Sequence, residues 1–143
     1  MASCLLNKIF DPFRKEWVVS TPEEIVRQNF LSYMIKELGY PQHLIALEKS
    51  LRELPSLKGQ KVPLRRIDIL CFERKTLSPL LLVECKAVPI NRKSLPQVMG
   101  YNAFIKAPFI ALVNANSIVF GWKDEEKNRW CYGDALPQFT ELE

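Results

Sequence analysis

Two carboxylates and one lysine lie within apolar segments of this 143-residue chain, at a spacing that could support chemistry. Glu84 and Lys86 follow the apolar run 79–83, with one residue between them. Asp68 lies sixteen positions before Glu84, inside an earlier apolar run. A charge in a buried strand costs free energy unless it is paired or binds a metal ion. These three residues are therefore the first candidates for a functional site.

The chemistry that this set allows depends on how the two segments pair. Side chains alternate between the faces of a strand, so Glu84 and Lys86 project to the same side. If the segment with Asp68 is a hairpin neighbour, two carboxylates meet and repel each other unless a cation is present. Carboxylate oxygens suit Mg²⁺, which completes its coordination shell with water and substrate phosphate. Lys86 could then orient or deprotonate a water, or stabilise charge on a phosphate.

A simpler alternative is an ordinary Glu-Lys pair on the solvent face of a strand. Glu-x-Lys is a common pattern with low specificity when it stands alone. The alternatives are therefore a solvated ion pair and a site for metal-assisted phosphodiester hydrolysis.

The first element that must position these residues is a helix over 22–38. Thr21 can cap it, Pro22 suits the first helical position, and Glu24 lies where a capping box has its acid. Gly39 ends it, with Pro41 just beyond. Apolar residues recur along it at three- and four-residue steps, namely Val26, Phe30, Tyr33, Met34 and Leu38.

Strands are predicted over 44–51, 64–72 and 79–87, and the apolar character of the third favours a central position. A second helix, capped by Ser94, is expected to end near 106–108. Later segments predict further strands at 109–113, 117–122 and, at an edge, 130–132. The order predicts an α/β fold with a mixed sheet of about five strands flanked by two main helices. We expect one domain, with an N-terminal arm (1–20), a core (21–122) and a C-terminal extension (123–143).

Composition is that of an ordinary globular chain, 48% hydrophobic and 25% charged, with a mild net charge of +4. That charge is compatible with a polyanionic partner but does not require one. Four widely spaced cysteines and a single histidine, His43, do not form a zinc-finger pattern. No signal peptide is recognisable, and no apolar run approaches the roughly 18 residues of a membrane span. The sequence predicts a cytoplasmic protein that does not enter a membrane.

Five short segments, 21–28, 37–41, 66–70, 82–87 and 97–102, carry a family resemblance when taken together. As a set they resemble the PD-(D/E)XK nuclease superfamily. More narrowly, they are similar to the N-terminal nuclease domain of type I restriction enzyme motor subunits and the stand-alone proteins grouped with it. The resemblance covers about two thirds of the chain, in the family's order, and implies a restriction-endonuclease-like core.

The resemblance also implies roles for particular residues. Asp68 and Glu84 would hold Mg²⁺ or Mn²⁺, and Lys86 would serve catalysis. Glu24 matches the family's first-helix acid, although a capping-box role would explain it equally well. Gln97 and Tyr101 match the family's Q-x-x-x-Y motif, which lies near the site and helps to hold DNA or the metal's surroundings. Gln97 could instead cap its helix, and Tyr101 could be a core residue.

Basic residues near these segments, Arg65, Arg66, Arg92 and Lys93, could form a positive rim that contacts phosphates. Ile67 occupies a position that is often proline in the family, a change that a strand tolerates. No P-loop pattern follows, so we do not expect motor activity.

The leading hypothesis is a Mg²⁺-dependent endonuclease that hydrolyses DNA by metal-activated water. The alternative is a non-catalytic module of the same fold that binds nucleic acid or a protein, and a purely structural use of the fold is a third. The expected partner is DNA; the resemblance also allows a homodimer, and helicase or restriction-modification proteins as partners.

Overall fold

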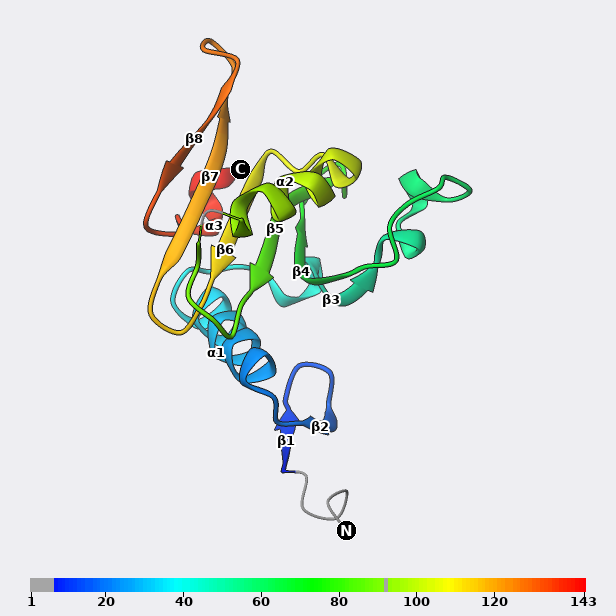
Figure 1. The fold of residues 1–143 in the computed structure, drawn as a ribbon, viewed down its shortest axis with the longest axis vertical. Coiled ribbons are helices and arrows are strands. Elements are labelled where there is room, and N and C mark those ends of the chain that lie inside the picture. The colour runs from blue at the N-terminus through cyan, green and yellow to red at the C-terminus, as the bar shows by residue number, and fades with distance from the viewer. Residues whose placement is uncertain (1–6, 92) are drawn as a thin grey trace.

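A six-stranded mixed sheet forms the centre of the computed structural model, which describes residues 7–91 and 93–143 (Figure 1). The strand order is β3-β4-β5-β6-β7-β8, and only β5 and β6 run parallel. The strands are β3 (Ile45–Ser50), β4 (Arg66–Phe72), β5 (Pro79–Cys85), β6 (Phe109–Val113), β7 (Ile118–Asp124) and β8 (Arg129–Gly133). The predicted α/β class is confirmed. The sheet has six strands rather than about five because 129–133 pairs with β7.

Helices cover both faces of this sheet, which explains why residues 79–83 of β5 form a continuous apolar run. Helices α1 (Pro22–Lys36) and α3 (Phe139–Leu142) pack on one face, and α2 (Ser94–Ile105) packs on the other. Val83 of β5 lies in the cluster beneath α1, whereas Leu82 lies in the cluster beneath α2. Parallel strands need a crossover, and α2 supplies it between β5 and β6.

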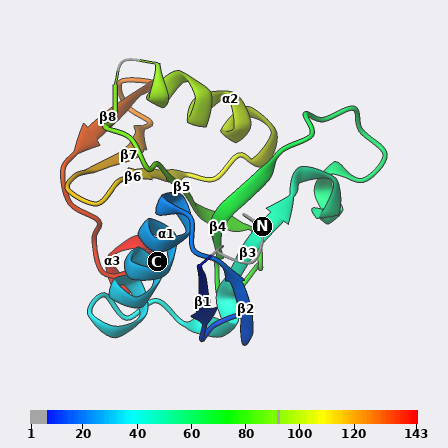
Figure 2. The ribbon, with the colours of Figure 1, turned by 60° about the horizontal axis from the view of Figure 1, so that its bottom comes forward.

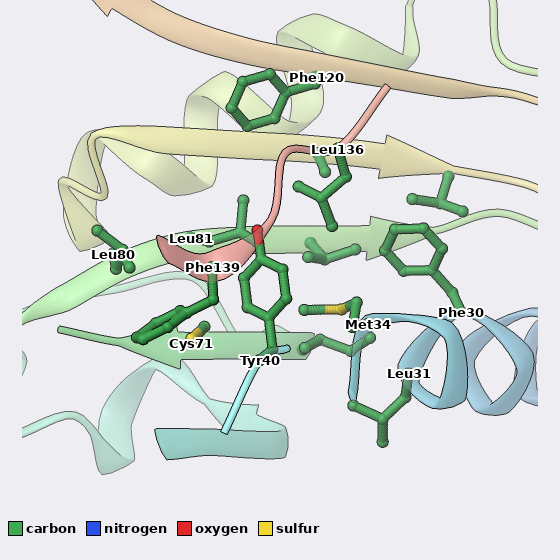
Figure 3. Packing of buried hydrophobic residues seen from close by; sticks show 14 of the residues in the cluster. Phe30, Leu31, Met34, Tyr40, Cys71, Leu80, Leu81, Phe120, Leu136 and Phe139 are labelled. Carbon is green, nitrogen blue, oxygen red and sulfur yellow. The ribbon is translucent and has the colours of Figure 1, made fainter. Parts of the chain in front are cut away.

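The C-terminal residues belong to the core on the α1 face. The Tyr40 ring packs edge-on against Phe139, with ring centroids 5.5 Å apart, in the core that also contains Met34 (Figure 3). The Tyr40 hydroxyl donates a hydrogen bond of 2.9 Å to the Pro137 carbonyl oxygen. Leu136 and Phe139 are both buried. The segment predicted as a C-terminal extension thus completes the sheet and fills part of the core.

The N-terminal arm contains a hairpin that the sequence did not predict. Strands β1 (Lys8–Asp11) and β2 (Glu16–Val19) pair antiparallel and lie at the start of α1 (Figures 1 and 2). The extended piece predicted near residue 20 corresponds to β2. Its partner β1 has no clear sequence signal, because each strand is only four residues long and Pro12 and charged residues interrupt the apolar pattern.

Element boundaries follow the sequence signals within about two residues in most places. Helix α1 begins after Thr21, whose Oγ1 accepts a hydrogen bond of 3.0 Å from the Glu24 backbone N–H. The chain turns at Gly39, which has a φ of +74° that glycine adopts without strain. The prediction that Ser94 caps α2 is wrong. Ser94 lies inside the first turn, and its hydroxyl accepts from the Asn91 N–H at 3.1 Å.

The segment between β3 and β4 contains two short 3-10 turns, Leu51–Glu53 and Pro55–Leu57. Its leucines at 51, 54 and 57 are buried in the cluster beneath α2, so the loop is anchored to the core. Among the helices that the structure describes, none is long and apolar enough to cross a membrane.

Candidate active site

Pairing registers place three acidic residues in one row across β3, β4 and β5. Continued by one residue, the register between β4 and β5 sets Asp68 opposite Glu84. In β3, Glu48 lies between the paired positions Leu47–Ile69 and Lys49–Ile67, which places it across from Asp68. Residues directly opposite each other in antiparallel strands share a face of the sheet. The hairpin pairing that the sequence argument required for Asp68 and Glu84 is therefore present, and a third carboxylate joins them.

This row opens into a hollow of about 670 Å³, the acidic cleft. The start of α1 contributes one wall, and the segment before β4 contributes another. The lining residues are Thr21, Pro22, Glu23, Glu24, Arg27, Glu48, Leu64, Arg65, Arg66, Asp68, Glu84, Lys86 and Ala87. The structure thus brings the first-helix acid and the strand acids to one place.

Asp68 and Glu84 are both buried at the base of the acidic cleft, with 8% and 3% of their surface exposed. Asp68 Oδ2 accepts a hydrogen bond of 2.8 Å from the Cys85 backbone N–H. Glu84 Oε1 is buried and has no hydrogen-bond partner among the described residues. Burial, and then repulsion by Asp68, raise the pKa of Glu84; burial also raises the pKa of Asp68. The repulsion within this buried pair favours the binding of a proton or a cation.

The chemistry of this donor set fits a hard divalent cation. Within residues 7–91 and 93–143, no group of three or more acidic, cysteine or histidine side chains lies close enough together to enclose a metal ion. A cation here would therefore have Asp68 and Glu84 as its carboxylate ligands. Mg²⁺ usually binds through one or two carboxylates and keeps several waters. The unpaired buried oxygen of Glu84 is the observation that favours this fit.

Two cationic side chains flank Glu84, and each is held by a residue of α2. Lys86 Nζ donates to Gln97 Oε1 at 3.4 Å. Arg65 Nη2 lies 3.7 Å from Glu84 Oε2, and its guanidinium lies over the Tyr101 ring, 4.5 Å from the centroid. Both positive charges oppose the rise in the pKa of Glu84. Gln97 therefore contacts the lysine of the site instead of capping its helix.

Glu24 takes part in an ionic network rather than a capping box. The Thr21 N–H is bonded to the Val19 carbonyl oxygen, and the Glu24 carboxylate instead accepts from Arg14 and Arg27. The capping-box interpretation of Glu24 is therefore wrong, although Thr21 caps as predicted.

The same network ties the N-terminal hairpin to the acidic cleft. Arg27, only 1% exposed, donates to Asp11 Oδ2 at 2.9 Å, and Asp11 is fully buried. Arg27 Nε lies 3.8 Å from Glu48 Oε1. Buried charges of this kind are tolerated only when they are paired. The hairpin thus stabilises the arginine around which Glu24 and Glu48 are arranged.

Sequence reasoning missed Glu48 as a member of the site. Its φ of +53° is rare for a residue other than glycine and is a strained conformation within a strand. Burial raises the pKa of its carboxyl group, and the charge of Arg27 opposes that rise. The available signal was an acid among apolar residues, the same signal that marked Asp68.

The predicted phosphate-binding residues do not all lie at the acidic cleft. Arg66 is exposed and lines the acidic cleft beside Arg65. Lys93 is exposed at the start of α2 but does not line the cleft. Arg92 lies outside the described residues. Tyr101 is half-buried and contacts Arg65.

Comparison with known proteins agrees with this architecture. A model of the family described as type I restriction enzyme R protein N terminus matches residues 22–137. The fragment structure of an HsdR subunit of a type I restriction enzyme from Vibrio vulnificus YJ016 has a TM-score of 0.57 and 18% sequence identity. That match covers 85% of this chain but only 24% of the other, and at this identity it shows the fold alone. No curated protein sequence matches the chain.

Proposed function

This chain belongs to the family of type I restriction enzyme R protein N termini, and we propose that its acidic cleft hydrolyses phosphodiester bonds of DNA with the help of Mg²⁺ or Mn²⁺. The observation that carries the proposal is the buried pair of Asp68 and Glu84, with an unpaired Glu84 oxygen and Lys86 beside it. A buried pair of repelling carboxylates lowers stability. Its presence at the base of an open cleft is explained if the pair holds a cation.

Asp68 and Glu84 would hold the metal through oxygen atoms. When bound, a divalent cation supplies a Lewis acid that polarises the phosphoryl oxygen and lowers the pKa of a coordinated water. Hydrolysis adds water across one P–O ester bond: the water oxygen attacks phosphorus, its proton goes to a base, and the departing alkoxide takes up a proton.

Lys86 is the residue of this chain that would contact the reacting phosphate. A lysine ammonium has three donors, and Gln97 Oε1 accepts one of them at 3.4 Å. Two donors remain for a phosphoryl oxygen or for the attacking water. A positive charge directed at a phosphate that gains negative charge in the transition state accelerates hydrolysis. Gln97 acts through Lys86, because its amide oxygen holds the ammonium group at the end of β5.

The test is a cleavage assay on supercoiled plasmid, linear duplex and single-stranded oligonucleotides, with Mg²⁺ or Mn²⁺. Wild-type protein is expected to nick or degrade DNA, and Lys86→Ala to lose about 10²- to 10³-fold in rate. Asp68→Asn should lose activity together with divalent-cation binding, measured by calorimetry. Lys75→Ala is the matched control, since it removes an exposed lysine from the turn between β4 and β5.

The proposal fails if folded wild-type protein cleaves neither DNA nor RNA with either metal. If that protein also binds no divalent cation, a non-catalytic module of the same fold becomes the better explanation.

A further inference from the structure

Arg65 occupies an unusual position at the mouth of the acidic cleft. Its guanidinium lies over the Tyr101 ring on one side and 3.7 Å from Glu84 Oε2 on another. The arginine side chain is 39% exposed, whereas that of Glu84 is 4% exposed. One end of this contact is therefore open to solvent and the other is buried with Asp68.

The geometry of the contact indicates charge attraction rather than a fixed hydrogen bond. A nitrogen-to-oxygen distance of 3.7 Å exceeds the 2.7–3.2 Å range of N–H···O bonds. At this distance the guanidinium nevertheless neutralises part of the charge that Asp68 and Glu84 build up together. Tyr101 holds the arginine independently, because the face of an aromatic ring attracts a cation.

We propose that Arg65 is an exchangeable cation: it neutralises Glu84 when no divalent cation is bound, and it contacts a backbone phosphate of the nucleic acid when one is. This inference rests on the proposed function, since it names a substrate contact of the same site. A divalent cation between Asp68 and Glu84 repels the guanidinium. The planar guanidinium has five donors, in a geometry that matches a phosphate.

In this scheme Tyr101 is a positioning residue for Arg65 and does not stack on a base. Tyr101 and Gln97 lie one turn apart on α2, and each contacts one cation beside Glu84. The two residues that the sequence grouped as a motif thus have parallel roles in this chain. Gln97 positions Lys86, and Tyr101 positions Arg65.

The first arm of the test measures Mn²⁺ affinity by titration calorimetry, without nucleic acid. Arg65→Ala should tighten Mn²⁺ binding by about two- to fivefold, the size expected for a partly exposed ion pair. Arg66→Ala is the control, because Arg66 carries the same charge in the same cleft and forms no ion pair with Glu84 among the described contacts. Unchanged or weaker binding in Arg65→Ala overturns the inference.

The second arm measures duplex DNA binding by fluorescence anisotropy over a salt series with Mn²⁺, in the Lys86→Ala background that prevents the proposed cleavage. Arg65→Ala should weaken binding and reduce the slope of log K against log[salt] by about one. Tyr101→Leu should behave the same way, and Tyr101→Phe should retain wild-type behaviour because it keeps the ring. The double variant Arg65→Ala/Tyr101→Leu should bind no more weakly than Arg65→Ala alone.

These outcomes separate the inference from the proposed function. If the wild type binds no Mn²⁺, both are overturned. If the wild type binds Mn²⁺ and DNA but the effects of Arg65→Ala and Tyr101→Leu on DNA binding add, Tyr101 contacts the nucleic acid directly and the inference alone is wrong.

Discussion

Replacing Glu84 with glutamine should stabilise the metal-free protein. The same change should abolish the stabilisation that a bound divalent cation gives the wild type. Glu84 is 3% exposed, lies opposite Asp68 and has an oxygen without a hydrogen-bond partner among the described residues. Glutamine has nearly the same shape and carries no charge. It therefore removes the repulsion between the two carboxylates and, together with it, one ligand of the proposed cation.

The magnitude follows from the pKa of Glu84, which burial and the charge of Asp68 raise from 4.5 to about 8. At pH 7 the unfolded chain has this carboxyl ionised, whereas the folded chain must keep it protonated. The difference between 4.5 and 7, at about 1.36 kcal/mol per pH unit, corresponds to an upper limit of about 3 kcal/mol. Because the new amide also needs hydrogen-bond partners, a gain of about 1–3 kcal/mol is expected.

The pH dependence of the stability difference between wild type and Glu84→Gln tests whether ionisation of Glu84 causes it. A carboxyl group whose pKa is raised on folding contributes most stability below 4.5, and this contribution is lost as the pH rises to about 8. The advantage of Glu84→Gln should therefore be absent at pH 4 and largest near pH 8.

Thermal denaturation with a chelator, followed by circular dichroism, measures this effect. A gain of 1–3 kcal/mol should raise the melting temperature by roughly 3–9 °C in a chain of this size. Added Mn²⁺ should raise the melting temperature of the wild type, by preferential binding to the folded state, but not that of Glu84→Gln. Glu125→Gln, an exposed residue after β7, makes the same charge change as a control. A chelated Glu84→Gln protein that melts below the wild type would refute the reasoning.

Three further substitutions test the scaffold. Asp11→Ala should lower the free energy of unfolding in urea by about 1.5–3 kcal/mol, because it removes the charged hydrogen bond from Arg27 to the hairpin while Glu24 still accepts from Arg27; a loss below 1 kcal/mol would contradict this role of the hairpin. Thr21→Ala should cost about 1 kcal/mol in the same assay by removing the cap of α1, and Thr21→Ser should restore most of it. Gly121→Ala should lower the melting temperature, because the added Cβ would lie 2.8 Å from Ile110 Cγ1, an overpacking that typically costs about 1–3 kcal/mol; an unchanged melting temperature would show that Ile110 moves aside.

Local patterns in the chain carried enough information to predict most of the fold. The apolar run of β5 predicted a strand buried on both faces, and helices α1 and α2 do cover both faces there. Thr21 and Gly39 marked the ends of α1 because capping and positive φ are decided within a few residues. Two capping predictions were wrong because the side chain has another hydrogen-bond partner. Ser94 accepts from the Asn91 N–H instead of capping α2, and the Glu24 carboxylate accepts from Arg14 and Arg27 instead of completing a capping box.

The sequence by itself determined the chemistry of the candidate site. Asp68, Glu84 and Lys86 are charges in apolar strands, and the alternation of a strand already puts Glu84 and Lys86 on one face. Only the tertiary structure decided what surrounds them. Strand register brought Glu48 opposite Asp68, and the packing of α2 placed Tyr101 beside Arg65. These contacts join residues about 20 to 36 positions apart, and local periodicity cannot specify them because they depend on how whole elements dock.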